Sequence, residues 1–236
     1  MRLLERCEDL TMNEYLTKEL NFIDGAKATI WKLKNKNPDE MTTTGINVFC
    51  GPQGSGKSLS MIHYAKKMIK DYPKAIVITN IELGFEVKNE VRKYQGFDDF
   101  KVENGIFGVI YILDEIHLIL NSLESKGVPL SIIVELSQQR KQRKCILGTS
   151  QVYSRMAKPL REQIKSVILC KNYFGIFQFN YLINAFETQE GSDGKLKFSK
   201  LKTSFFFHSK EDYLSYDTYK KMDNYVGINN NVSSYH

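Results

Sequence analysis

Cysteine is scarce in this 236-residue chain, and long apolar runs are missing. The four cysteines lie far apart without CxxC spacing, and three of them stand in apolar, strand-like runs where a reduced, buried thiol is expected. We therefore expect a reducing compartment, the cytoplasm, or the host cytoplasm if a phage encodes the protein. No window approaches the roughly 18 apolar residues of a membrane span, and acidic residues interrupt the N-terminal apolar positions that a signal peptide would need. The sequence predicts a protein that is neither secreted nor embedded in a membrane by a segment of its own.

Charge of either sign is also moderate. Lys and Arg total 33 against 27 acidic residues, which gives a net charge of +6. This excess permits an anionic partner but is too small to identify one. The apolar fraction of 42% and the charged fraction of 25% are near the averages of globular proteins, which excludes a disordered or fibrous chain. At this length we expect one main hydrophobic core.

Short apolar runs separated by helical stretches dominate the middle of the chain. Such runs are typical of buried parallel strands joined by helical crossovers, here with helices predicted over 57–70 and 130–143. Beyond Tyr173 an aromatic, alternating pattern with a Gly/Asp/Ser turn predicts added antiparallel strands. The fold class is therefore α/β, with a mostly parallel central sheet flanked by helices and antiparallel strands near the C-terminus. The runs read as strands are "INVFC", "AIVITNI", "GVIYILDE", "CILGTS" and "SVILCKN".

The chain divides by composition into three parts. Residues 1–44 carry scattered helical spacing and end in a polar stretch, so we expect a helical lead-in. Residues 45–221 form the predicted core domain. The polar end, 222–236, is expected to be a flexible tail.

The strongest motif is "GPQGSGKS", which matches GxxxxGK[ST] between a predicted strand and a predicted helix. Its glycines allow the backbone to wrap around phosphate so that consecutive N–H groups point inward at the helix N-terminus. The lysine would reach the β- and γ-phosphates, and the final serine would hold Mg²⁺ through its hydroxyl. The motif predicts a site for ATP and Mg²⁺, and the residues expected to bind the nucleotide are Gly51, Pro52, Gln53, Gly54, Ser55, Gly56, Lys57 and Ser58.

Two adjacent carboxylates follow the strand "GVIYIL". In a P-loop enzyme an acid at the end of a neighbouring strand holds the Mg²⁺ water shell, and this role suits Asp114. Glu115 could orient and polarise the attacking water, which a hydrolase needs and a phosphoryl-transfer kinase does not. Both acids could also cap the following helix, which is compatible with the metal role. We interpret His117 as a packed or surface helical histidine rather than a catalyst.

The order of these features resembles the FtsK/HerA superfamily of DNA-pumping ATPases. The P-loop is followed by a strand ending in Asp-Glu, a helix that carries arginines, and a strand ending in "GTSQ". Residues 144–172 are especially similar to the Zot-like phage assembly ATPases of that superfamily, and "SYDTYKK" at 215–221 resembles an element near the end of their core. The resemblance covers about 46–221. It implies that Gln151 is a sensor of the nucleotide.

The resemblance also gives a role to the basic stretch "QQRKQRK". Ring ATPases of this kind bind nucleotide between subunits, and a neighbour's arginine can stabilise charge on the transferring phosphoryl group. Arg140 occupies the position where related sequences carry an arginine, and Arg143 lies one turn further on the predicted helix. One of the two is expected to act in trans, and Arg155 and Arg161 are secondary candidates. A solvated basic helix end is the alternative.

Several functions remain open at this point. Zot-like proteins usually continue into a membrane span that this sequence lacks, which favours a compact motor that packages viral DNA as a homo-oligomeric ring, pentameric or hexameric. Its partners would be double-stranded DNA and a portal or procapsid. Lys126, in the loop 126–131, offers a candidate DNA contact. The alternatives are a Zot-like assembly ATPase for filamentous phage and a non-motor ATP-dependent switch. A nucleotide kinase is less favoured because no Arg-rich lid is seen.

Overall fold

The structure is a computed structural model that describes residues 27, 29–31, 34, 37–120, 130–151, 161–184, 189–190, 196–197 and 200–215. The chain divides into two compact units, 1–38 and 39–236. In the first unit the described residues between 27 and 34 are helical. The second unit contains the sheet and every site discussed below. The predicted boundaries at 44/45 and 221/222 stay predictions.

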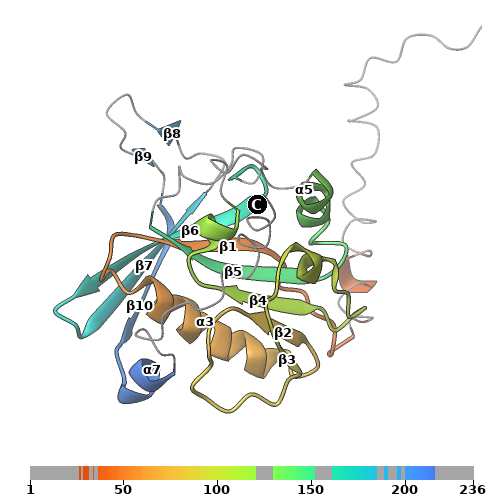
Figure 1. Cartoon of the computed structure of the whole chain (residues 1–236), viewed down its shortest axis with the longest axis horizontal. Coiled ribbons are helices and arrows are strands. Elements are labelled where there is room, and N and C mark those ends of the chain that lie inside the picture. Colours follow the sequence, from red (N-terminus) through yellow and green to blue (C-terminus); the bar gives the residue numbers. More distant parts are fainter. Residues whose placement is uncertain are drawn as a thin grey trace, which may run out of the picture. The chain divides into compact units, whose positions relative to one another are not determined.

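An eight-stranded sheet forms the centre of the second unit, with strand order β10-β7-β6-β1-β5-β4-β2-β3 (Figure 1). From β6 to β3 all neighbours are parallel, whereas β7 runs antiparallel to β6 and β10. A separate two-stranded sheet pairs β8 with β9. The strands are β1 (Gly45–Cys50), β2 (Ile76–Thr79), β3 (Val91–Lys93), β4 (Val109–Leu113), β5 (Lys144–Ser150), β6 (Ile164–Tyr173), β7 (Phe177–Asn184), β8 (Gln189–Glu190), β9 (Leu196–Lys197) and β10 (Lys200–Phe207).

The prediction of five parallel strands followed by antiparallel strands is confirmed. The parallel strands could be read from the sequence because helices cover both faces of the sheet. Every residue of β2, β4 and β5 is therefore buried, and each of these strands contains a run of at least three consecutive apolar residues. Strand β3 was not predicted. It is a three-residue edge strand whose side chains are all exposed, and it carries no apolar pattern.

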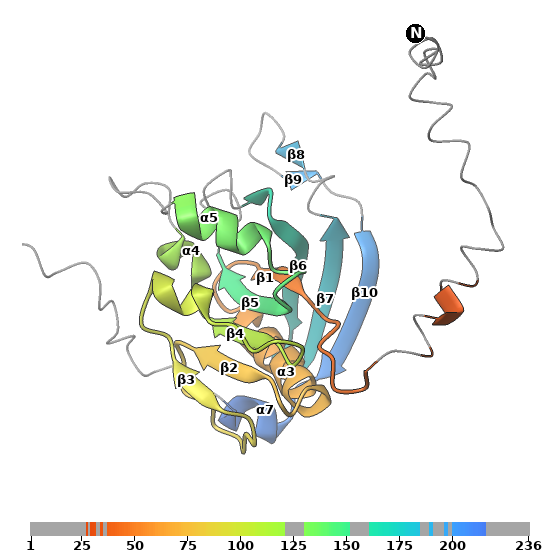
Figure 2. The ribbon, with the colours of Figure 1, turned by 90° about the vertical axis from the view of Figure 1, so that its right-hand side faces the viewer.

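Helices pack on both faces of the sheet (Figure 2). Helix α3 (Lys57–Asp71) covers one face and buries residues such as Met61 and Ala65 against β1, β4 and β5. The other face is covered by the 3-10 helix η1 (Phe97–Lys101) and by α4 (Ile116–Ile119) and α5 (Leu130–Ser137). Helix α7 (Lys210–Leu214) begins at a Ser209 cap and contacts α3. None of the helices in the described ranges is long and apolar enough to span a membrane.

The helix predicted over 130–143 is wrong in its extent. Helix α5 ends at Ser137, and residues 138–143 form successive turns before β5 begins. Arg143, the last of them, adopts a left-handed conformation with φ of 52°. The stretch "QQRKQR" offers few apolar side chains to bury, so packing does not extend the helix. Arg140 and Arg143 therefore do not lie one above the other on a helix face.

Candidate nucleotide-binding and catalytic site

The phosphate-binding motif forms the connection between β1 and α3, as the sequence predicts. Gly54 and Gly56 adopt left-handed φ values of 76° and 80°, and Gly56 immediately precedes the first residue of α3. A Cβ at Gly56 would lie 2.0 Å from the side-chain oxygen of Gln178, so only glycine fits there. The loop thus delivers its backbone N–H groups to the N-terminus of a 15-residue helix, which is a site suited to phosphate.

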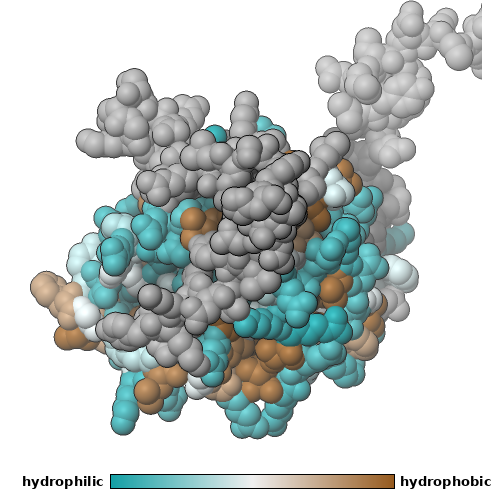
Figure 3. Space-filling view, in the orientation of Figure 1, coloured by the Kyte–Doolittle hydropathy of each residue, from teal (hydrophilic) through white to brown (hydrophobic). Residues whose placement is uncertain are grey.

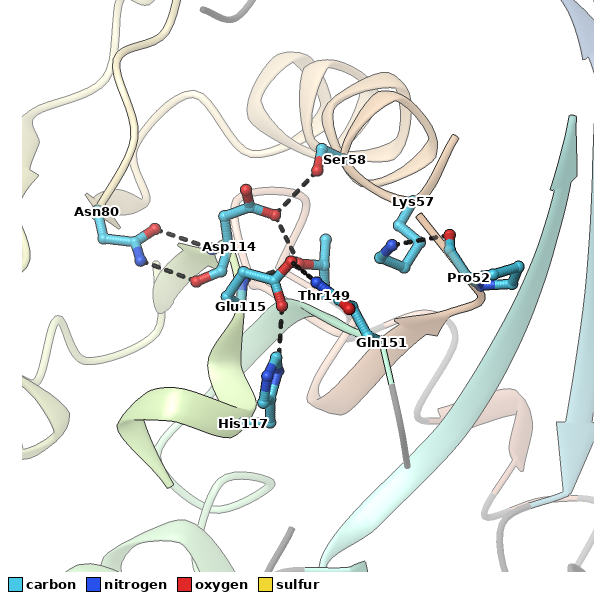
Figure 4. A network of polar contacts seen from close by, with 9 residues as sticks. All are labelled: Pro52, Lys57, Ser58, Asn80, Asp114, Glu115, His117, Thr149 and Gln151. Carbon is cyan, nitrogen blue, oxygen red and sulfur yellow. Dashed lines mark hydrogen bonds and ion pairs between the residues drawn. The ribbon is translucent and has the colours of Figure 1, made fainter. Parts of the chain in front are cut away.

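Lys57 folds back over this loop. Its side chain is largely buried, and Nζ donates a hydrogen bond to the carbonyl oxygen of Pro52 at 3.1 Å (Figure 4). The ammonium group is therefore held beside the loop by a neutral carbonyl partner, which a phosphate oxygen can replace. This is where the motif predicts a cation for the terminal phosphates.

Asp114 follows β4 and lies opposite the start of α3. The hydroxyl of Ser58 donates to Oδ1 of Asp114 at 2.9 Å, and the Thr149 hydroxyl donates to the same oxygen at 2.5 Å. A serine hydroxyl and a carboxylate in contact at the end of a phosphate-binding loop are hard oxygen donors that Mg²⁺ accepts. The described residues contain no cluster of three or more His, Cys, Asp or Glu side chains.

Glu115 has a constrained backbone and two side-chain contacts. Its φ of 50° is left-handed, and its N–H donates to Thr149 Oγ1 at 2.8 Å. Gln151 donates to Oε1 at 3.3 Å, and Nδ1 of the buried His117 lies 3.1 Å from Oε2. In Figure 4 the Glu115 side chain points toward His117. The sequence-predicted Glu115 and Gln151 are therefore brought together, and His117 lies beside them.

A comparison with solved structures found similar chains at low sequence identity. The chain is similar to the N-terminal domain of zonular occludens toxin from Neisseria meningitidis, with 16% identity, a TM-score of 0.49, and coverage of 73% of this chain and 98% of that chain. It is similar to the genome packaging NTPase B204 from Sulfolobus turreted icosahedral virus 2 in complex with ATP-gammaS, with 15% identity, a TM-score of 0.45, and coverage of 70% and 98%. It is also similar to the flagellar accessory protein FlaH from Methanocaldococcus jannaschii, with 12% identity, a TM-score of 0.41, and coverage of 58% of this chain and 76% of that chain.

No family model and no curated protein matches the sequence. The fold assignment therefore depends on the strand order and the loop geometry. The chain has the P-loop NTPase fold. A glycine-rich loop between β1 and α3, followed by an acid at the end of β4 in hydrogen-bond contact with Ser58, is the arrangement that defines this fold.

Asn80 and Thr149 are parts of this P-loop NTPase site that the sequence analysis missed. Asn80 follows β2, donates to the carbonyl oxygen of Asp114 at 2.9 Å and accepts its N–H at 2.8 Å. Thr149 lies in β5 and contacts both carboxylate residues. Because β2 and β5 flank β4 in the sheet, both side chains hold the Asp-Glu pair from its two sides. The strand order that creates these contacts is not visible in the spacing of residues along the chain.

A second missed group lies beneath the phosphate loop. Gln178 of β7 is completely buried, and its Nε2 donates to the carbonyl oxygen of Ser55 at 3.0 Å. Two residues further along β7, Asn180 accepts a hydrogen bond of 2.9 Å from Ser60 of α3. The antiparallel strand β7 therefore supports the loop and the first turns of α3 through polar side chains. In the sequence, the alternation of these two polar residues with the aromatic residues of 177–181 could have indicated that one face of the strand makes polar contacts.

The basic stretch divides into paired and exposed cations. Nη2 of Arg143 forms an ion pair with Glu40 at 2.5 Å, and Lys144 is buried, with Nζ 2.6 Å from both Glu135 and the carbonyl oxygen of Phe100. Arg140 is exposed, as is the lysine that follows it.

These cations lie at the amino edge of the parallel strands, whereas the phosphate loop lies at the carboxyl edge. The length of the strands therefore separates these cations from the phosphate loop of the same chain. Residues 121–129 and 152–160 lie outside the described part, and with them Lys126 and Arg155; the resemblance at 216–221 lies outside it too. Arg161 is described and half-buried.

The three described cysteines are buried thiols, as the apolar context predicts. Burial raises the pKa of Cys170 to about 12, although Ser60 and Lys57 oppose the shift. Burial likewise raises the pKa of Cys145 to about 12. Such thiols stay protonated near neutral pH, so none of them acts as a nucleophile in this site.

Proposed function

We propose that this protein hydrolyses Mg-ATP. The observation that carries the proposal is the contact between Ser58 and Asp114 at 2.9 Å, with a second carboxylate, Glu115, immediately after Asp114 and held by Thr149. A binding-only P-loop needs the lysine and the metal contact, but it has no use for a second carboxylate fixed beside them. Glu115 is fixed by a left-handed backbone, by Thr149 and by Gln151, which supports a chemical role.

Each side chain of the site has a separate role in the proposed reaction. The loop amides and Lys57 bind the β- and γ-phosphates, and Lys57 exchanges its Pro52 carbonyl partner for a phosphate oxygen. Ser58 and Asp114 would hold Mg²⁺, which supplies positive charge to the phosphate oxygens when bound. Glu115 orients the attacking water and accepts its proton. Thr149 fixes the positions of both carboxylate residues through one hydroxyl group.

A Glu115→Gln protein tests this assignment. The substitution keeps the side-chain volume but removes the basic oxygen, so ATP should still bind while turnover falls by about 10² to 10⁴-fold. Binding is measured by calorimetry with ATP and Mg²⁺, and turnover by phosphate release. The control is Glu103→Gln, the same change at an exposed loop residue. Wild-type turnover in the Glu115→Gln protein would contradict the proposal.

The order of motifs supports a further proposal, that the ATPase works on double-stranded DNA as a homo-oligomeric ring, with viral genome packaging as its role. In such a ring Arg140 would act on the neighbour's nucleotide, and its exposure leaves it accessible to another subunit. Gln151 would report the nucleotide state through its contact with Glu115.

Light scattering across a concentration series and ATPase assays with a linear duplex test this second proposal. A concentration-dependent ring and turnover stimulated by the duplex at low salt are expected. A monomeric protein whose ATP turnover does not change when DNA is added would favour the non-motor switch. Stimulation only with a procapsid, or only with a filamentous-phage membrane partner, would separate packaging from Zot-like assembly.

A further inference from the structure

The strands β6, β7 and β10 carry an unusual set of side chains on the sheet face opposite α3. Side chains alternate between the two faces, and the cross-strand pairing aligns Tyr173 with Phe177, and Phe179 with Phe205. Phe207 pairs with Phe177 on the same face. We call this surface the aromatic sheet face, and its members are Lys171, Tyr173, Phe177, Phe179, Tyr181, Lys200, Phe205 and Phe207.

The rings of this face contact one another and stay accessible. Phe205 and Phe207 are each 61% exposed, which is high for phenylalanine in a strand of a larger sheet. The Phe179 ring is nearly parallel to those of Tyr181 and Phe205, with interplanar angles of 18° and 26° and centroids 6.5 and 5.7 Å apart. These neighbours share an orientation and offer a row of flat apolar surfaces.

Lysines lie among these rings. Nζ of Lys200 is 4.4 Å from the centroid of the Tyr181 ring, and Nζ of Lys171 is 5.8 Å from it. Strand β6 has 10 residues, and β7 and β10 have 8 each. Together these 26 residues include four lysines but no aspartate or glutamate. These three strands therefore contribute aromatic and cationic side chains and no acid.

We propose that the aromatic sheet face binds single-stranded nucleic acid. Its exposed bases can stack on Phe179, Phe205 and neighbouring rings, and the two lysines can contact phosphates. A duplex hides its base faces and leaves the rings without a partner. The inference goes beyond the proposed work on duplex DNA, because it concerns a separate surface and a different form of nucleic acid and requires no ATP turnover.

An anionic membrane is the main competing occupant, because aromatic and lysine side chains also suit that interface. The turn between β6 and β7 is apolar, with Phe174 90% and Ile176 52% exposed, and Figure 3 shows brown atoms at the left margin where Figure 1 places this turn. On the sheet face itself, however, the positions 173, 177, 179, 181, 205 and 207 are all aromatic rather than aliphatic. Stacking requires rings, whereas lipid insertion does not, so the composition favours bases.

Fluorescence anisotropy with a fluorescein-labelled oligo(dT) of about 20 nucleotides tests the proposal, using the full chain without nucleotide at low salt. The protein should bind this probe, and Phe205→Ala and Phe207→Ala should each weaken binding by about 5 to 150-fold. Phe205→Trp should retain binding, and Lys200→Gln should reduce its salt dependence. The control is Tyr64→Ala, which removes an exposed ring from α3. Circular dichroism verifies that each variant is folded.

The other outcomes would overturn the proposal. In the first, the wild-type protein and the Phe variants bind the probe with equal affinity. In the second, the protein binds phosphatidylserine vesicles but not oligo(dT). In the third, Phe205→Ala changes only self-association, measured by light scattering. An oligo(rU) probe shows whether the sugar matters. Binding of the probe is measured without ATP, so a protein that does not bind oligo(dT) could still show the expected loss of turnover in Glu115→Gln. Likewise, an unexpected result for Glu115→Gln would not affect the oligo(dT) measurement.

Discussion

Replacing Thr149 by valine removes one hydroxyl group that serves both carboxylate residues. Valine keeps the shape of threonine, so the change isolates two hydrogen bonds: the 2.5 Å bond to Asp114 and the 2.8 Å bond from the Glu115 N–H. A hydrogen bond to a charged group contributes about 1.5 to 3 kcal/mol, and an unpaired buried N–H costs about 1 to 3 kcal/mol. Because Asp114 is only partly buried, water can replace part of the loss, and we expect about 2 to 4 kcal/mol of destabilisation.

Urea unfolding followed by circular dichroism measures this loss, and phosphate release measures turnover. Since Thr149 contacts the residues proposed to hold Mg²⁺ and the attacking water, turnover should fall about 10 to 100-fold. Thr149→Ser is the matched control, because it keeps the hydroxyl and loses one methyl group. It should cost about 1 kcal/mol and leave turnover near that of the wild type. If valine proved as stable and active as threonine, or serine proved as harmful as valine, the assigned role of the hydroxyl would be wrong.

Three further predictions concern other parts of the chain. Arg140→Ala should bind ATP but turn over at least about 10³-fold more slowly, whereas alanine at the following lysine should have little effect; normal turnover would rule out the trans role. Burial opposes ionisation of Asp212, but hydrogen bonds from the Ser209 cap and nearby cations outweigh it and lower its pKa below 3.8. The stability advantage over Asp212→Asn should therefore be full above pH 3.8 and disappear as pH falls through the lowered pKa, which unfolding curves at several pH values can check. In a variant that keeps only Cys145 and Cys170, alkylation at about pH 8 should occur only as the protein unfolds; fast labelling of the folded protein would refute their burial.

Features set by local sequence could be predicted, whereas contacts set by strand order could not. The phosphate loop, Asp114 and Glu115 were found because a turn motif and the end of an apolar run are contiguous in the sequence. Thr149 was missed because its partners become neighbours only when β5 pairs with β4. Gln178 was missed for the same reason, since its contact with Ser55 spans 123 residues.

The basic stretch shows the opposite error, in which local sequence suggested too much. Arg140 and Arg143 were placed one turn apart on a predicted helix, yet Arg143 follows the end of that helix and pairs with Glu40, 103 residues away. Lys144, the next cation, begins a buried strand and pairs with Glu135. Charge along a chain does not reveal which cations are neutralised by distant acids. The proposed trans role remains open for Arg140, which stays exposed.

Strand β7 limits which insertions and deletions the protein can tolerate. Gln178 and Asn180 face the phosphate loop and α3, while Phe177, Phe179 and Tyr181 face the other way. Losing or gaining one residue within β7 would exchange the two sets, placing aromatic rings under the loop and amides on the open face. The turn at 174–176 can change length with far less harm because it precedes the strand. Length variation in related sequences should therefore be found in that turn and be absent from 177–181, or occur there only in steps of two.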